Sequence, residues 1–225
     1  MTERVILYHY PLCPLCRLVR LALYEKGIPH ALILENPWDR RPAFLEKNPL
    51  GEVPVIVEPD GQVLSHAETL CEYLNEINPA PDLIGQTPRG RAEVRRLMGW
   101  THDVFYHEVV KPILTERVIK AVQKKGVPNS MVLHAARENY KILMPYVEWL
   151  ASHRSNLAGR HLSYADFAVA AQISVLDYLG ELNWDNLNEA KEWYARIKSR
   201  QSFKSLLQDK IGAIMPVTEY VNLDF

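Results

Sequence analysis

The chain has 225 residues and a formal net charge of −1, with 24% charged and 48% hydrophobic residues. This length allows one or two domains, each with a proper core. A nearly neutral charge gives no electrostatic reason to expect a nucleic acid or an anionic membrane surface as a partner. We find no apolar run of roughly 18 to 20 residues, so we expect no membrane span.

The first part of the chain alternates between strand and helix patterns. An apolar run at residues 5–8 predicts a buried strand, and a proline turn leads from it into an amphipathic helix that stops at Gly27. A second strand follows closely, which implies parallel pairing through a right-handed crossover. Asp60-Gly61 between two apolar runs is a strong hairpin signal. We predict strands at residues 5–8, 31–34, 53–57 and 62–64 and helices at residues 14–26 and 68–77. One further short helix is predicted before the hairpin.

The second part of the chain is predicted to be all helical. We place domains at residues 1–78 and 90–210, a proline-dense linker at 79–89 and an extended C-terminal tail at 211–225. Pro112 predicts a bend in the first long helix. Ser163 and Asp166 form a capping box ahead of a helix that is apolar nearly all round, so this helix belongs in the middle of the domain. The helices are predicted at residues 91–122, 130–150, 163–178, 188–198 and 203–209.

Cys13 is the first candidate for chemistry. It lies just ahead of a helix amino terminus, where unpaired amide donors and the helix dipole favour the thiolate of a nucleophile or redox residue. The alternative is that Cys13 and Cys16 are small, weakly polar residues at a helix start. Three cysteines, an odd number, argue against a disulfide framework. The amino terminus has no signal-peptide pattern, so we expect the reducing cytoplasm.

The Cys-Pro-Leu-Cys helix start at residues 13–16, facing Val53-Pro54, resembles the thioredoxin-like half of the glutathione transferase superfamily. The capped central helix resembles the folding signature of the same superfamily. The resemblance implies an α/β N-terminal thioredoxin-like domain followed by an all-α C-terminal domain. It also implies a cis peptide before Pro54, whose neighbouring backbone would pair with the extended backbone of bound glutathione.

His66 and Ala67 depart from this resemblance. In such transferases a Glu or Gln followed by Ser holds the charged γ-glutamyl end of glutathione. Ala67 has no side-chain donor, and losing such hydrogen bonds costs about 1 to 3 kcal/mol each in a desolvated site. We therefore expect weak or absent glutathione binding and favour no cofactor, although Cys13, Val53 and Pro54 remain equivalents of a glutathione site.

Two surface features indicate a partner protein. Trp38 lies in a polar loop, where it either roofs the gap between strand and short helix or serves as a binding anchor. The tail ends in Leu223, Asp224 and Phe225. Its apolar and aromatic content favours either docking on its own domain or presentation as a recognition peptide.

Other candidate sites have simpler explanations. His102, His107 and Glu108 lack the i, i+4 spacing that places two imidazoles on one helix face, so we predict no metal site and expect surface or cap histidines. Cys71 is interpreted as a core residue.

The runs at residues 162–166, 173–181, 190–194 and 223–225 resemble a narrower family of alphaproteobacterial division proteins. That family is transferase-like in fold, dimeric and known for binding the tubulin-like protein FtsZ rather than for catalysis. The resemblance implies a cytoplasmic homodimer at the division site, with Trp38 and the tail at Asp224 as partner-binding positions. The Cys-Pro-Leu-Cys sequence departs from that family. It leaves an alternative open, a glutathione-dependent transferase or thiol reductase that uses Cys13.

Overall fold

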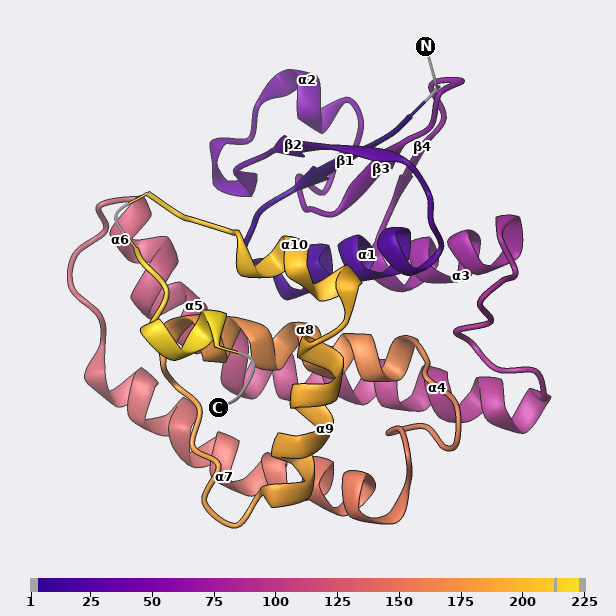
Figure 1. The fold of residues 1–225 in the computed structure, drawn as a ribbon. Helices are drawn as coiled ribbons and strands as arrows, with labels where there is room; N and C mark the ends of the chain where they lie inside the picture. Colours follow the sequence, from indigo (N-terminus) through magenta and orange to yellow (C-terminus); the bar gives the residue numbers. More distant parts are fainter. Residues whose placement is uncertain (1–3, 213, 223–225) are drawn as a thin grey trace.

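The computed structural model describes residues 4–212 and 214–222, which form a small sheet-containing part and a larger helical part (Figure 1). Four strands make one mixed sheet in the order β2-β1-β3-β4. The strands are β1 (Val5–His9), β2 (His30–Leu34), β3 (Val55–Val57) and β4 (Val63–Ser65). β1 and β2 run parallel, and β3 is antiparallel to both of its neighbours. The predicted parallel unit and the predicted hairpin are confirmed.

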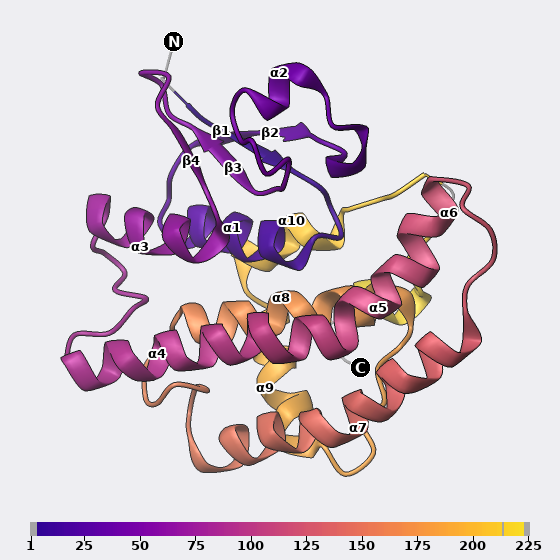
Figure 2. The same cartoon turned by 180° about the vertical axis from the view of Figure 1, so that it is seen from behind.

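Two helices lie between the sheet and the helical part. They are α1 (Pro14–Glu25) and α3 (Ala67–Ile77), whereas α2 (Pro42–Leu45) lies on the other side of the sheet (Figures 1 and 2). Pro14 occupies the first turn of α1, where no backbone donor is lost. Gly27 follows α1 with a φ of 63°, a conformation that suits glycine and ends the helix as predicted.

The helical part begins with a long helix whose hydrogen-bond pattern changes along its length. Its segments are α4 (Pro88–Trp100), the π-helical η2 (Thr101–Val110), α5 (Lys111–Leu114), the π-helical η3 (Thr115–Ile119) and α6 (Lys120–Val122). Pro112, where we predicted a bend, lies in α5 between the two π-helical segments, a stretch where the regular α-helical hydrogen-bond pattern is interrupted. The helix begins earlier than predicted, because the Thr87 hydroxyl accepts from the Gly90 N–H at 3.0 Å. Residues 88 and 89 are therefore helical rather than part of the linker.

The central helix α8 (Tyr164–Leu179) runs through the middle of the helical part, as predicted, and all of its residues are buried. The predicted capping box is present. The Asp166 carboxylate accepts hydrogen bonds from Ser163 N–H at 2.9 Å, Leu157 N–H at 2.8 Å and Trp193 Nε1 at 3.0 Å. This one buried group ties the start of α8 to the preceding loop and to α9 (Asn188–Lys198).

The other helices of this part are α7 (Ser130–His153), the 3-10 turn η4 (Gln201–Phe203) and α10 (Lys204–Leu207). The last two replace the single helix that we predicted over residues 203–209. Within residues 4–212 and 214–222, no helix combines the length and the apolar character needed to cross a bilayer.

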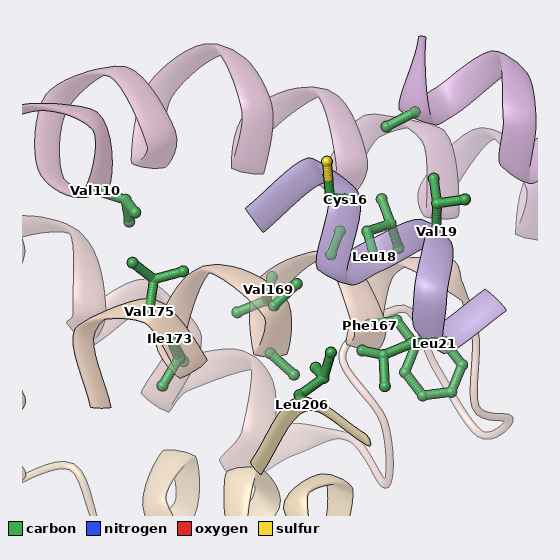
Figure 3. Close-up of a cluster of buried hydrophobic side chains, with 14 of the residues drawn as sticks. Cys16, Leu18, Val19, Leu21, Val110, Phe167, Val169, Ile173, Val175 and Leu206 are labelled. Atoms are coloured by element: carbon green, nitrogen blue, oxygen red, sulfur yellow. The ribbon is translucent and has the colours of Figure 1, made fainter. Parts of the chain in front are cut away.

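The two parts of the molecule meet where α1 packs on α8. Apolar side chains of α1, α8 and α10 form one buried cluster that also contains the sulfur of Cys16 (Figure 3).

Charged groups are buried beside this cluster. Arg17 donates to the Ser174 hydroxyl at 2.7 Å and to Asp209 at 3.2 Å, and Arg20 contacts the same carboxylate at 2.8 Å. Asp209, which lies in the segment after α10, therefore neutralises the charges of two arginines of α1.

The C-terminal tail packs against its own domain through Tyr220. Residues Thr218–Val221 form a 3-10 turn, so the prediction of an extended tail is wrong for this stretch. The Tyr220 side chain is fully buried, and its hydroxyl donates to the Leu206 carbonyl at 3.0 Å. The Arg17 guanidinium and the Lys198 ammonium lie 5.8 and 5.6 Å from the centre of its ring. These contacts hold residues 218–221 against the helical part of the molecule.

We expect Asp209→Ala to destabilise the protein by about 3 to 5 kcal/mol, because it leaves two buried guanidinium groups without their counter-charge. Urea unfolding followed by circular dichroism measures the change. Asp185→Ala removes an exposed carboxylate and serves as the matched control, with an expected change below about 0.5 kcal/mol. Equal stability of the two variants would contradict the role assigned to Asp209.

The pH dependence of stability should contain a contribution from His9, the last residue of β1. Burial, helped by the charge of Arg20, lowers the pKa of His9 from 6.5 to about 4. The unfolded chain therefore binds more protons between these values, so stability falls as the pH drops from about 6.5 to about 4, by roughly 3 kcal/mol. We expect His9→Gln to flatten the stability profile in this range, measured by urea unfolding at a series of pH values. The exposed control His134→Gln should keep the native slope.

Candidate functional site

Cys13 precedes the first turn of α1. Its backbone N–H donates to the Tyr10 carbonyl at 3.0 Å, and its carbonyl accepts from the Arg17 N–H at 3.0 Å, so the backbone at the turn is fixed on both sides. The Cys13 side chain is partly exposed, whereas Cys16 is buried. Of the two residues, Cys13 is therefore the more accessible.

The two cysteines differ in their acidity. A hydrogen bond from the Cys16 thiol lowers the pKa of Cys13, and the backbone amides of Cys16 and Leu15 and the charge of Arg17 lower it further against the opposing effect of burial. Burial, together with the same hydrogen bond, raises the pKa of Cys16. This is the thiolate-favouring environment predicted for a thiol at a helix amino terminus.

The backbone that faces Cys13 has the geometry implied by the resemblance. The peptide bond between Val53 and Pro54 is cis. The Cys13 sulfur lies 3.9 Å from the Val53 carbonyl oxygen. Val55 pairs with Ser65 across β3 and β4, so Pro54 and His66 lie at the same end of the hairpin. The structure therefore brings the predicted glutathione-site equivalents together.

The side chains needed to hold the γ-glutamyl group are not provided by His66 and Ala67. His66 has a φ of 77° and makes no side-chain capping bond to α3, and Ala67 is 2% exposed and carries no polar atom. Backbone amides at the start of α3 are available to an anion, but a matching side-chain hydroxyl is not. These two positions therefore differ from the Glu or Gln followed by Ser that the resemblance implies for a glutathione site.

Two tyrosines that lie near Cys13 were not among the site residues predicted from the sequence. The Tyr10 side chain is buried, and its hydroxyl has no hydrogen-bond partner among the described residues. Burial, followed by the charges of Cys13, Cys16 and Glu52, raises the pKa of Tyr106 in η2. Burial likewise raises the pKa of Tyr10, so both phenols stay protonated near the thiol. Tyr10 directly precedes the proline turn, and this position could have identified it as a site residue. No local sequence pattern marks Tyr106 as a site residue.

The histidines gather more closely than their spacing suggested. The His66 and His102 rings are 6.2 Å apart, the His102 and His107 rings are 5.8 Å apart, and His102 stacks on Tyr106. We interpreted His102 and His107 as surface or cap residues, but His102 is half-buried between these rings. Within the described ranges, no group of three or more metal-binding side chains is placed to hold an ion.

Trp38 lies in η1 (Pro37–Asp39), on a loop that its own side chains hold in place. The buried Glu35 carboxylate forms an ion pair with Arg41 across the base of this loop. The Trp38 ring meets the Tyr10 ring edge to face at a centroid distance of 5.0 Å. Trp38 is half-buried and packs against the edge of the hydrophobic core. The predicted partner-binding residues Leu223, Asp224 and Phe225 lie outside the described residues.

The comparisons with known proteins agree with this geometry. Residues 7–82 match the family model of the glutathione S-transferase N-terminal domain. Over the full length of both chains, this sequence is 39% identical to FtsZ-localized protein A of Caulobacter vibrioides.

Two solved structures are similar over nearly the whole chain. FzlA from C. crescentus has a TM-score of 0.96 at 38% identity, covering 99% of this chain and 100% of that one. A glutathione S-transferase from Rhodospirillum rubrum also has a TM-score of 0.96, at 43% identity, covering 98% of this chain and 100% of that one. The chain therefore belongs to the glutathione S-transferase superfamily and, within it, to the family of FtsZ-localized protein A.

Proposed function

We propose that the protein is a non-catalytic, glutathione-transferase-like protein that binds FtsZ and regulates its filaments in bacterial cytokinesis. The observation that carries the proposal is the full-length similarity to FtsZ-localized protein A, at 39% identity. We further propose that it acts in the cytoplasm at the division site, as a homodimer, and without a bound cofactor.

The candidate site supports this proposal in two ways. His66 and Ala67 lack the side-chain anchors of a glutathione site, and the loss of each hydrogen bond costs about 1 to 3 kcal/mol of binding. Trp38 is an aromatic side chain on a loop held by the ion pair of Glu35 with Arg41. A preorganised aromatic side chain loses little conformational entropy on binding, which suits a protein interface.

The tail adds a second contact to the proposed interface. Tyr220 is fixed by the Leu206 carbonyl and by two cationic neighbours, so residues 218–221 are held against the domain. Asp224 is only four residues further along the chain. We therefore propose that Tyr220 keeps Asp224 within reach of the same partner that contacts Trp38.

Co-sedimentation with FtsZ polymers tests the proposed surface. We expect Trp38→Ala and Asp224→Lys each to weaken binding at least about tenfold, because both remove a proposed anchor. Trp38→Phe keeps a ring against Tyr10 and should retain most of the binding. Asp185→Lys reverses an exposed charge elsewhere and should bind like the wild type. Equal sedimentation of all variants would count against this surface.

The acidity of Cys13 favours a second candidate function. A lowered pKa and a position just ahead of a helix amino terminus are properties of an attacking thiol. In this alternative the protein is a glutathione-dependent transferase or thiol reductase, with Cys13 as the residue that stabilises or attacks sulfur.

Calorimetric titration with glutathione separates the two functions. We expect the native protein to bind at millimolar strength or weaker, and Cys13→Ser to leave the titration unchanged. The double variant His66→Glu with Ala67→Ser restores the missing side-chain partners and should bind at least about tenfold more tightly than the native protein. Micromolar binding by the native protein that Cys13→Ser abolishes would instead favour the enzyme.

A further inference from the structure

A cavity of about 360 Å³ lies where the sheet-containing part, α6 and the C-terminal tail meet. The lining residues that matter here are Tyr10, Leu34, Asn36, Val122, Lys210 and Ile211. Figures 1 and 2 show the segment after α10 running to the tip of α6. The cavity is therefore formed by chain segments that are distant in sequence.

Large apolar side chains around this cavity remain exposed. Leu34 is 59% exposed and Val122 is 41% exposed, and Met215 in the nearby tail is 63% exposed. Leu34 ends β2, which is an outer strand of the sheet, and the preceding Leu32 and Ile33 are also exposed. Apolar side chains gathered at a hollow surface are typical of a protein interaction site.

Most of the exposed charges near the cavity are basic. Lys210 lines the cavity, and the exposed Lys124 and Lys125 follow α6 after Gln123, close in sequence to the lining Val122. The carboxylates of Asp209 and Glu35 are paired with arginines, and the exposed Asp39 accepts a hydrogen bond from the lining Asn36 at 3.1 Å. The rim is therefore complementary to acidic rather than basic groups.

We propose that this cavity takes a large apolar side chain from an acidic segment of the partner protein. The apolar side chain supplies affinity by filling the pocket, and carboxylates beside it pair with the lysines of the rim. The inference rests on the proposed function, in which the partner is FtsZ. Trp38 packs on Tyr10 and is two residues from Asn36, and both of these residues line the cavity, so the cavity lies beside the surface proposed for FtsZ.

Val122→Glu and Lys210→Glu test the apolar and the basic component separately in the full-length protein. Ile77→Glu and Arg89→Glu are matched controls at exposed positions. They change the end of α3 and the start of α4, which Figures 1 and 2 place far from α6. In co-sedimentation with FtsZ polymers, each cavity variant should bind at least about tenfold more weakly, and both controls should match the wild type. Circular dichroism verifies that every variant is folded.

Short fluorescent peptides probe the cavity without FtsZ. One peptide carries a phenylalanine flanked by acidic residues, a second replaces the acidic residues with lysines, and a third replaces the phenylalanine with alanine. Fluorescence anisotropy should show the tightest binding for the first peptide, and Val122→Glu should weaken it.

The outcomes separate this inference from the proposed function. If the cavity variants sediment with FtsZ like their controls while Trp38→Ala does not, this inference is overturned and the proposed function stands. If the wild type does not sediment with FtsZ, the proposed function fails, and the peptide measurements alone then test the cavity proposal. Equal anisotropy for the three peptides then overturns the cavity proposal, and preference for the acidic phenylalanine peptide supports it.

Discussion

Two arginines buried in α1 share one counter-ion, Asp209, and the arrangement of the whole molecule depends on this contact. Burying a charge is costly unless its partners stand in a fixed geometry. Arg17 satisfies this requirement with the Pro11 carbonyl, the Ser174 hydroxyl and Asp209, which come from three different segments. Any rotation of the sheet-containing part relative to α8 would break these bonds. The network therefore fixes how the two parts meet, beyond what apolar packing alone would specify.

The same contact links the thiol site to the proposed partner surface. Cys13 begins the helix that carries Arg17, and Asp209 directly precedes Lys210 and Ile211, which line the cavity beside α6. Tyr220 lies against the Arg17 guanidinium, so the tail also depends on α1. One helix thus positions both regions, although only the surface residues would need to contact a partner.

At this site the backbone has the geometry implied by the resemblance, whereas two side-chain positions differ from it. The cis peptide before Pro54, the turn at Cys13 and the positive φ of His66 are properties of the backbone that the fold maintains. The side chains of His66 and Ala67 contribute no capping bond to α3, so exchanging them removes no side-chain cap from this helix. Function resides in such exchangeable side chains rather than in the fold itself.

Local patterns in the sequence were enough to determine the parallel strand unit, the hairpin at Asp60-Gly61 and the capped central helix, because each depends on residues close together in the chain. Other features were decided only by the tertiary structure. Arg17 meets Asp209 across 192 positions, and Tyr106 comes beside Cys13 from another part of the fold. The docking of Tyr220 likewise depends on distant cations. No local period encodes such contacts, since they form only after the elements have packed.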